Sequence, residues 1–175
     1  FLLNAADCGV PQKRERVFFC AVRDDIKAKP LELKPQHRWI SAGEACEDLQ
    51  ELTALEKNET KPAPNDLKCW PNTKKGDDYS KWLVRSENRK ACFNQYRIDD
   101  RKPSNTLSST AGLYTHWDKC RTLTFREWKR LGSFPDDYHA KTDKIGKYMI
   151  GMSVPPKMTE QVAKAVIEQW LQPNY

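Results

Sequence analysis

The sequence predicts a mixed fold of helices and strands, and three segments carry that prediction. Gly9 and Pro11 mark a turn, after which the apolar run over residues 17–22 is typical of a buried strand. Thr124 and Glu127 have the spacing of a capping box, which predicts a helix that ends at Gly132. A second helix is expected after a Pro pair, with a mostly apolar stripe that indicates core packing and consists of Met158, Val162, Ala165, Val166, Gln169 and Trp170.

The connecting segments give weaker signals. Ser41 and Glu44 have capping-box spacing, so a short helix is expected there. Residues 52–78 are rich in Lys, Asn, Pro and Asp without clear periodicity, which predicts loops. Residues 79–120 mix aromatic and basic positions in short segments, which we interpret as strands of a small irregular domain. A DNA-facing surface and a solvated charged face over a thin core both fit that composition.

Length and composition predict a folded protein with a polar partner. The 175 residues suffice for one ordinary domain or two small ones. Six Trp, six Tyr and six Phe favour a packed core, whereas 31% charged residues predict an unusually polar surface. The net charge of +6 and the isoelectric point near 9.0 make a polyanion such as nucleic acid the first candidate partner.

The cysteines and the apolar segments indicate where the protein works. Six cysteines occur without a C-x-x-C pair and with only three histidines in the chain, so no metal is expected and the thiols should be reduced. No apolar segment reaches the length of a membrane span and no signal peptide is evident, which predicts a cytoplasmic protein without a membrane partner. The first residue is Phe1 rather than Met, so we expect a piece of something larger.

Gln12, Arg14 and Arg16 alternate along a chain that is expected to be extended. Alternate side chains of an extended chain share a face, so three hydrogen-bonding groups should project the same way. The planar fork of Arg suits a carbonyl, carboxylate or phosphate oxygen. This pattern indicates a ligand about as strongly as it indicates a simple polar turn before a strand.

Three blocks together resemble the cytosine-5 DNA methyltransferases. "NAADCGVPQKRERVFFCAVR" resembles their motif VIII, with its Gln-x-Arg-x-Arg core. "RTLTFREWKRLGSFPDDY" resembles motif IX, and "IGMSVPPKMTEQVAKAV" resembles motif X. The blocks follow the order of the family, and the variable segment between the first two lies where the family has its target-recognition domain.

The resemblance implies an α/β fold, namely the C-terminal part of a Rossmann-like S-adenosylmethionine-dependent methyltransferase with a small, irregular, mainly β target-recognition domain. Residues 1–50 would end the catalytic domain, and residues 51–120 would form the target-recognition domain. Residues 121–175 would contain the motif IX helix, a linker and a motif X helix that returns to the catalytic domain. A core incomplete by itself implies an exposed apolar edge that requires a partner.

The resemblance also implies a chemistry, transfer of a methyl group from S-adenosyl-L-methionine to C5 of a cytosine flipped out of duplex DNA. A cysteine thiolate attacks C6, and negative charge builds around O2 and N3, so a cation aimed at O2 stabilises the transition state. Arg16 is the implied cation. Arg14 would be a second active-site arginine that helps to place the nucleophile loop and the base, and Gln12 a supporting hydrogen-bonding group.

Motif X is implied to bind the cofactor through Gly151, Met152 and Ser153. Gly151 permits close backbone approach, and Ser153 offers a hydroxyl to the methionine moiety. Met152 stands where the family usually has Asn, so any contact made by an amide side chain is lost.

The recognition region and motif IX supply the remaining candidates. Thr106 and Leu107 resemble the Thr-Leu pair of the family's recognition domains, and Thr106 is implied to approach DNA near the flipped base. Arg126 and Glu127 of motif IX are implied to tie the recognition domain to the catalytic domain. Further candidate contacts to phosphate or guanine are Arg85, Arg89, Arg97 and Arg101.

The sequence lacks the Gly-containing cofactor loop, the Pro-Cys nucleophile and the Glu-Asn-Val block of the family. The favoured hypothesis is a small subunit or fragment that needs double-stranded DNA and a second polypeptide with motifs I to VII and the catalytic cysteine. The alternative is a non-catalytic DNA-binding module. The intact Gln12, Arg14 and Arg16 favour the first and Met152 favours the second, while an RNA-directed relative is a third reading. The protein is expected in the bacterial cytoplasm, associated with the nucleoid.

Overall fold

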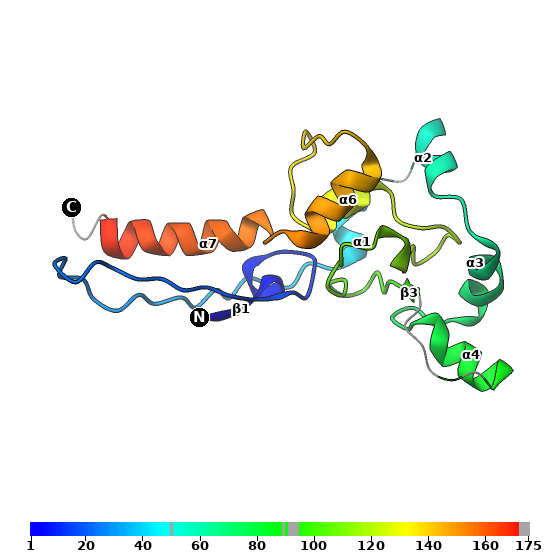
Figure 1. The fold of residues 1–175 in the computed structure, drawn as a ribbon, viewed down its shortest axis with the longest axis horizontal. Helices are drawn as coiled ribbons and strands as arrows, with labels where there is room; N and C mark the ends of the chain where they lie inside the picture. The colour runs from blue at the N-terminus through cyan, green and yellow to red at the C-terminus, as the bar shows by residue number, and fades with distance from the viewer. Residues whose placement is uncertain (50, 89, 91–94, 172–175) are drawn as a thin grey trace.

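The computed structural model describes residues 1–49, 51–88, 90 and 95–171, which form an elongated molecule (Figure 1). A long ribbon of residues 18–40 lies beside one terminal helix at one end, three short helices lie at the other end, and the remaining helices lie between them. The α-helices are α1 (Ala42–Ala45), α2 (Ala54–Glu59), α3 (Pro64–Cys69), α4 (Tyr79–Glu87), α5 (Phe125–Leu131), α6 (Asp143–Met152) and α7 (Pro156–Val166). The strands are β1 (Leu2–Asn4), β2 (Glu15–Val17), β3 (Tyr96–Arg97) and β4 (Tyr114–Thr115). Short 3-10 helices are η1 (Ala5–Cys8), η2 (Trp70–Asn72) and η3 (Ala111–Leu113), and η4 (Ile167–Leu171) is a π-helical turn.

The main hydrophobic core surrounds α5. A capping box between Thr124 and Glu127 begins this helix and Gly132 ends it, as the sequence predicts. Trp128 of α5 is fully buried and meets Tyr114 edge-on, with ring centroids 5.6 Å apart. Ala42, Leu107 and Ile150 belong to the same cluster. The core therefore contains residues from all three ranges into which the motifs divide the chain.

The α7 helix forms a second cluster with the N-terminal segment. Met158 and Val162 are buried against Leu3, Ala5 and Val10, so the predicted core packing of these two stripe residues is confirmed. Further along, the Gln169 side chain exchanges two hydrogen bonds of 2.9 Å with the backbone of Glu32. Trp170 Nε1 donates to the Lys29 carbonyl at 2.8 Å. These contacts attach the ribbon to α7 and η4.

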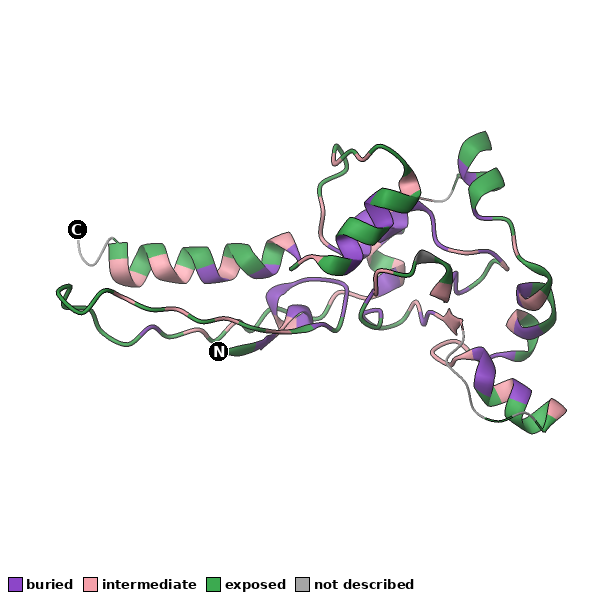
Figure 2. Ribbon diagram, viewed as in Figure 1, coloured by how far each residue is buried: buried purple, intermediate pink, exposed green. Residues whose placement is uncertain are grey.

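The prediction of a buried strand over residues 17–22 is wrong. β2 ends at Val17 and pairs antiparallel with β1, with Leu2 opposite Val17. Val17 is 57% exposed and Phe19 is 95% exposed, and most of the ribbon is exposed in Figure 2. The reason is that β1 contains only three residues, so strand pairing ends near Phe18. Phe18 and Cys20 pack partly against the second cluster, whereas Val17 and Phe19 stay exposed. Phe1, Leu2, Val17 and Phe19 are exposed apolar residues at this end of the β1–β2 pair.

The prediction of a mainly β recognition region is also wrong. Residues 51–120 contain α2, α3 and α4, whereas β3 and β4 contain two residues each and pair in parallel. Local caps explain the helices that composition did not predict: Thr53 and Glu56 form a capping box on α2, and Asp78 accepts from Lys81 N at the start of α4. Helices of six to nine residues carry too few turns for a clear apolar period.

Candidate functional site

Gln12 and Arg14 lie inside the molecule, whereas Arg16 reaches its surface. Gln12 is 1% exposed; its Oε1 accepts from Leu107 N at 3.1 Å and its Nε2 donates to Leu131 O at 3.2 Å. Arg14 is 3% exposed. Arg16 is half-buried and its Nη1 donates to its neighbour's carbonyl, Glu15 O, at 2.7 Å. The face predicted for Gln12 and Arg14 is therefore filled by the chain's own backbone.

Arg14 connects two distant parts of the sequence. Its Nη1 donates to Leu107 O at 2.7 Å, and its Nη2 donates to Gly151 O at 2.8 Å. Burial, and then the charge of Arg16, lowers the pKa of Arg14 to about 10, so the guanidinium remains charged at neutral pH. The described backbone thus receives hydrogen bonds from two of its nitrogens, while the buried Nε has no partner among the described residues.

Gly151 makes the close approach that the sequence predicts, but to backbone of this chain. A Cβ at this position would lie 2.2 Å from Ser108 O and 2.7 Å from Ser109 N. Only glycine therefore fits where the end of α6 meets residues 108–109. Met152 is 62% exposed, and the half-buried Ser153 donates its hydroxyl to Ile150 O at 2.8 Å.

The two residues of the Thr-Leu pair face opposite ways. Thr106 is exposed, and its hydroxyl donates to Lys13 O at 2.7 Å. Leu107, the other member of the predicted DNA-binding pair, is fully buried in the main core. Successive side chains of an extended segment alternate, and the apolar one faces the core.

The four arginines predicted to bind DNA differ in exposure and in their contacts. Arg97 stacks on Trp70 at 3.8 Å and donates to Trp117 O and Thr73 O, so this guanidinium serves the fold rather than a phosphate. Arg101 is exposed but forms a two-armed pair with Asp99 at 2.9 and 3.1 Å, and hydrogen bonding to Arg101 lowers the pKa of that carboxyl. Arg85 is exposed on α4. Arg89 lies outside the described residues.

The two motif IX residues of α5, Arg126 and Glu127, form ion pairs with residues outside the helix. Arg126 forms a two-armed bond with Glu56 of α2, a residue of the predicted recognition domain. Glu127 receives two hydrogen bonds from Arg121, at 2.8 and 2.7 Å, and a third from Thr124 N. Burial would raise the pKa of the Glu127 carboxyl, but the bonds and charge of Arg121 outweigh it and lower the pKa.

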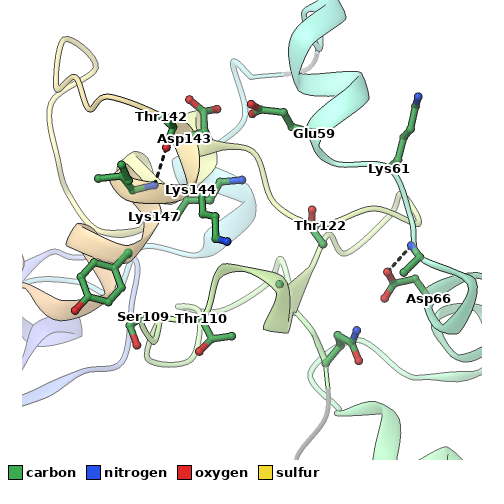
Figure 3. A pocket seen from close by; sticks show the side chains of 15 residues that line it. Glu59, Lys61, Asp66, Ser109, Thr110, Thr122, Thr142, Asp143, Lys144 and Lys147 are labelled. Carbon is green, nitrogen blue, oxygen red and sulfur yellow. Dashed lines mark hydrogen bonds between the residues drawn. The ribbon is translucent and has the colours of Figure 1, made fainter.

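A cleft of about 1010 Å³ lies between α6, the α2–α3 region and residues 109–112. Figure 3 shows Lys144 and Lys147 on its α6 wall, Ser109 and Thr110 on another, and Glu59 extending toward Asp143. Lys147 is buried and donates to Leu123 O at 2.8 Å, and burial lowers its pKa. Burial, and then a hydrogen bond with Asp143, raises the pKa of Glu59. Lys144 is exposed and offers a positive charge to this opening.

The sequence reasoning missed α6 and hence this cleft. Thr142 caps α6 by accepting from Ile145 N at 3.2 Å. A threonine followed by Asp143 in the first turn was the available signal for a helix start. Lys144, Ser109 and Thr110 thus join the candidate site from two segments far apart in sequence.

The described residues contain neither a cluster of metal-ligating side chains nor a membrane-spanning helix. No group of three or more His, Cys, Asp or Glu in the described ranges has the arrangement of a metal site. Within the same ranges, every helix is too short or too polar to cross a bilayer.

Comparison with known proteins defines a class of DNA-modifying enzymes. The family described as C-5 cytosine-specific DNA methylase matches residues 1–168, and the chain belongs to that family. The Type II methyltransferase M.BbvI of Brevibacillus brevis is 30% identical over 99% of this chain and 50% of its own length. M.MthTI of Methanothermobacter thermautotrophicus is 30% identical over 94% of the chain and 54% of its own length. The chain thus spans about half the length of these relatives.

A solved structure shares the fold. The crystal structure of an Escherichia coli prophage protein assigned as a DNA modification methyltransferase superposes with a TM-score of 0.63. The match covers 97% of this chain and 59% of that protein, at 19% identity. At this identity the likeness concerns the arrangement of the elements.

Proposed function

We propose that the chain supplies target recognition and part of the active site of a DNA (cytosine-5)-methyltransferase. The observation that carries the proposal is that the segment of motif X shares one hydrophobic cluster with motif IX and a second with motif VIII, while Arg16 stays at the surface. In the proposed reaction a methyl group passes to C5 of a cytosine flipped out of duplex DNA.

Arg16 is the proposed catalytic cation. When a thiolate adds to C6, negative charge develops around O2 and N3, and a fixed cation near O2 stabilises that state more than the ground state. The described contact of Arg16 with Glu15 O uses one of the five N–H donors of a guanidinium, which leaves donors for a carbonyl oxygen.

The nucleophile comes from outside this sequence. None of the six cysteines follows a proline. Among those described, Cys8, Cys46 and Cys69 are buried, and burial raises the pKa of Cys8 to about 11, which disfavours a thiolate. We therefore infer that motifs I to VII, with the catalytic cysteine, belong to a second polypeptide or to another segment of a longer chain. The present chain by itself would not methylate DNA.

C-5 cytosine DNA methyltransferases use S-adenosyl-L-methionine as methyl donor. When bound, it supplies the electrophilic methyl group. The residues of this chain fit contact with one side of such a molecule, because the Ser153 hydroxyl donates within the chain and retains lone pairs for an ammonium donor. Met152 is exposed beside it and would add apolar contact.

DNA is proposed to lie along the exposed parts of residues 106–110 and the cleft beside them. Thr106 and Thr110 are exposed, and Lys144 adds a positive charge across the cleft. Hydroxyls and a lysine are groups that contact bases and phosphates, respectively. The net charge of +6 supports a polyanionic partner.

Complementation tests the proposal. The chain is mixed with a polypeptide that carries motifs I to VII, and transfer of labelled methyl groups from S-adenosylmethionine to duplex DNA is measured. We expect transfer only when both are present. No gain over the partner alone contradicts the proposal, and DNA binding by the chain without any transfer supports the non-catalytic module instead.

A further inference from the structure

Arg14 hydrogen-bonds two segments that the proposed function assigns to DNA and to the cofactor, so a coupling between them rests on that function. We propose that Arg14 is a positioning residue that joins the Thr-Leu segment (residues 104–110) to motif X, so that cofactor binding and target-DNA binding depend on each other.

Four consecutive residues of motif VIII, 11–14, form hydrogen bonds with the Thr-Leu segment. Pro11 O accepts from Ser104 N, and Lys13 N donates to Ser104 O. Lys13 O accepts from Thr106 Oγ1 at 2.7 Å. Gln12 accepts from Leu107 N, and Arg14 donates to Leu107 O, so both backbone groups of Leu107 are bound by motif VIII side chains. The exposed Thr106 is therefore placed by residues 11–14.

The same guanidinium holds motif X. Arg14 Nη2 donates to Gly151 O at 2.8 Å, while Nη1 is bonded to Leu107 O. Both carbonyls lie in the buried interior, where a lost partner is costly. A single lysine ammonium lacks the planar fork that reaches two carbonyls at fixed geometry. Among the described residues, Arg14 is the one side chain that donates hydrogen bonds to both the Thr-Leu segment and motif X.

The two segments also touch directly. The end of α6 approaches Ser108 so closely that a Cβ on Gly151 would lie 2.2 Å from Ser108 O. Protein interiors are packed too tightly for one of these backbones to shift while the other stays in place. A ligand that orders the exposed Met152 and Ser153 thus also orders residues 106–108.

Ordering of one segment by its ligand lowers the cost of ordering the other. By thermodynamic linkage, a cofactor that tightens DNA binding is itself bound more tightly when DNA is present. Coupling of this kind commonly amounts to about 5- to 150-fold in affinity. We expect the wild-type complex to fall in that range and the loss of Arg14 to bring the factor close to unity.

The test uses the complex of this chain with the polypeptide carrying motifs I to VII. The dissociation constant for target duplex is measured with and without S-adenosylhomocysteine, and the ratio of the two is the readout. Wild type should show a ratio of about 5 or more, and Arg14→Lys a ratio of about 1 to 2. Arg130→Lys is the matched control, because Arg130 also makes two-armed bonds, but to the side chains of Asp48 and Asp136.

The ratio separates positioning from general damage, because loss of folded protein lowers the active concentration without changing a ratio of affinities. A wild-type ratio near 1, or an unchanged ratio in Arg14→Lys, overturns the inference. Methyl transfer by the wild-type complex is assayed in parallel, so failure of the proposed function is recorded separately.

A measurement on wild type alone covers the case in which Arg14→Lys does not fold. Hydrogen exchange of a peptide spanning residues 104–110 is followed in the complex without DNA. S-adenosylhomocysteine should slow exchange in that peptide severalfold. Unchanged exchange there, with slower exchange around residues 151–153, overturns the coupling through Arg14.

Discussion

Arg126 on α5 and Glu56 on α2 form a two-armed salt bridge, with Nε 2.7 Å from Oε1 and Nη2 2.8 Å from Oε2. Glu56 Oε2 also accepts from Thr53 N at 2.9 Å, so one carboxylate both begins α2 and ties it to α5. Burial would raise the pKa of Glu56, but the bonds from Arg126 and Thr53 outweigh it and lower the pKa.

Glu56→Gln tests this tie. Loss of the charge should lower the free energy of unfolding by about 1–2 kcal/mol, measured by urea denaturation at pH 7. Glu44→Gln is the matched control, since Glu44 also forms a two-armed pair, with Arg38, but at an exposed site. The control should change stability by less than about 0.5 kcal/mol. Equal effects in both variants contradict a special role for Glu56.

Gly151 and Gly112 make a matched pair of glycines. A Cβ at Gly151 meets the backbone of Ser108, whereas a Cβ at Gly112 meets no atom within 4 Å. Gly151→Ala should therefore cost about 1–3 kcal/mol of folding stability, and Gly112→Ala should be close to neutral. Thermal unfolding of the two variants measures the difference. Similar melting temperatures for both would contradict the close contact.

His116 predicts a pH dependence of stability. Burial, and then the charge of Arg121, lowers the pKa of His116 to about 4, and its Nδ1 accepts from the backbone amides of Asp118 and Lys119. The unfolded chain, with an ordinary His pKa near 6.5, therefore binds more protons than the folded chain between about pH 6.5 and 4. This residue's contribution is unchanged above that window, and stability should fall by about 2–3 kcal/mol as pH decreases through it.

Substitution separates this residue from other titrating groups. His116→Asn retains a side-chain acceptor but does not titrate, so it should reduce the loss of stability between pH 6.5 and 4 in urea denaturation. His139→Asn changes an exposed histidine and should leave that loss as in wild type. The same pH dependence in all three proteins would show that His116 is not its source.

Lys144 tests the cleft as a DNA-binding surface. An exposed lysine that contacts a phosphate contributes about one unit to the slope of log affinity against log salt concentration. Lys144→Ala should reduce that slope by about one and weaken binding to all duplex sequences to a similar degree. Lys164→Ala on α7, where Lys164 pairs with Glu160, should leave both unchanged. An unchanged slope in Lys144→Ala places DNA elsewhere.

Local signals in the sequence predicted local structure. The capping box of Thr124 and Glu127 and the apolar Met158 and Val162 needed only neighbours within one or two turns, and the structure contains both features. The strand over residues 17–22 was mispredicted because burial of an apolar run depends on a partner, and the described chain gives Phe19 none.

Long-range contacts explain what the sequence left unpredicted in the candidate site. Gln12 and Arg14 look like ligand-binding residues until their partners, Leu107 and Gly151, are known, and these lie 93 to 137 positions away. Arg97 likewise resembled a phosphate contact because nothing in the sequence places Trp70 and Trp117 beside it. The residue type of an arginine indicates that it donates hydrogen bonds, whereas the tertiary fold decides whether a ligand or the backbone accepts them.

Arg16 carries the sharpest prediction about catalysis. If its guanidinium stabilises charge at cytosine O2 in the transition state, Arg16→Ala in the complemented enzyme should lower the rate of methyl transfer by about 100-fold or more. The affinity for target duplex should fall by less than about 3-fold, because ground-state contact at O2 contributes little to DNA binding. Single-turnover methyl transfer and equilibrium DNA binding measure the two quantities on the same preparation. Arg85→Ala, at an exposed arginine on α4, should show the opposite pattern if that residue contacts phosphate. Equal losses of rate and affinity in Arg16→Ala would show that Arg16 is a phosphate contact. The catalytic cation would then belong to the part of the enzyme that carries the catalytic cysteine.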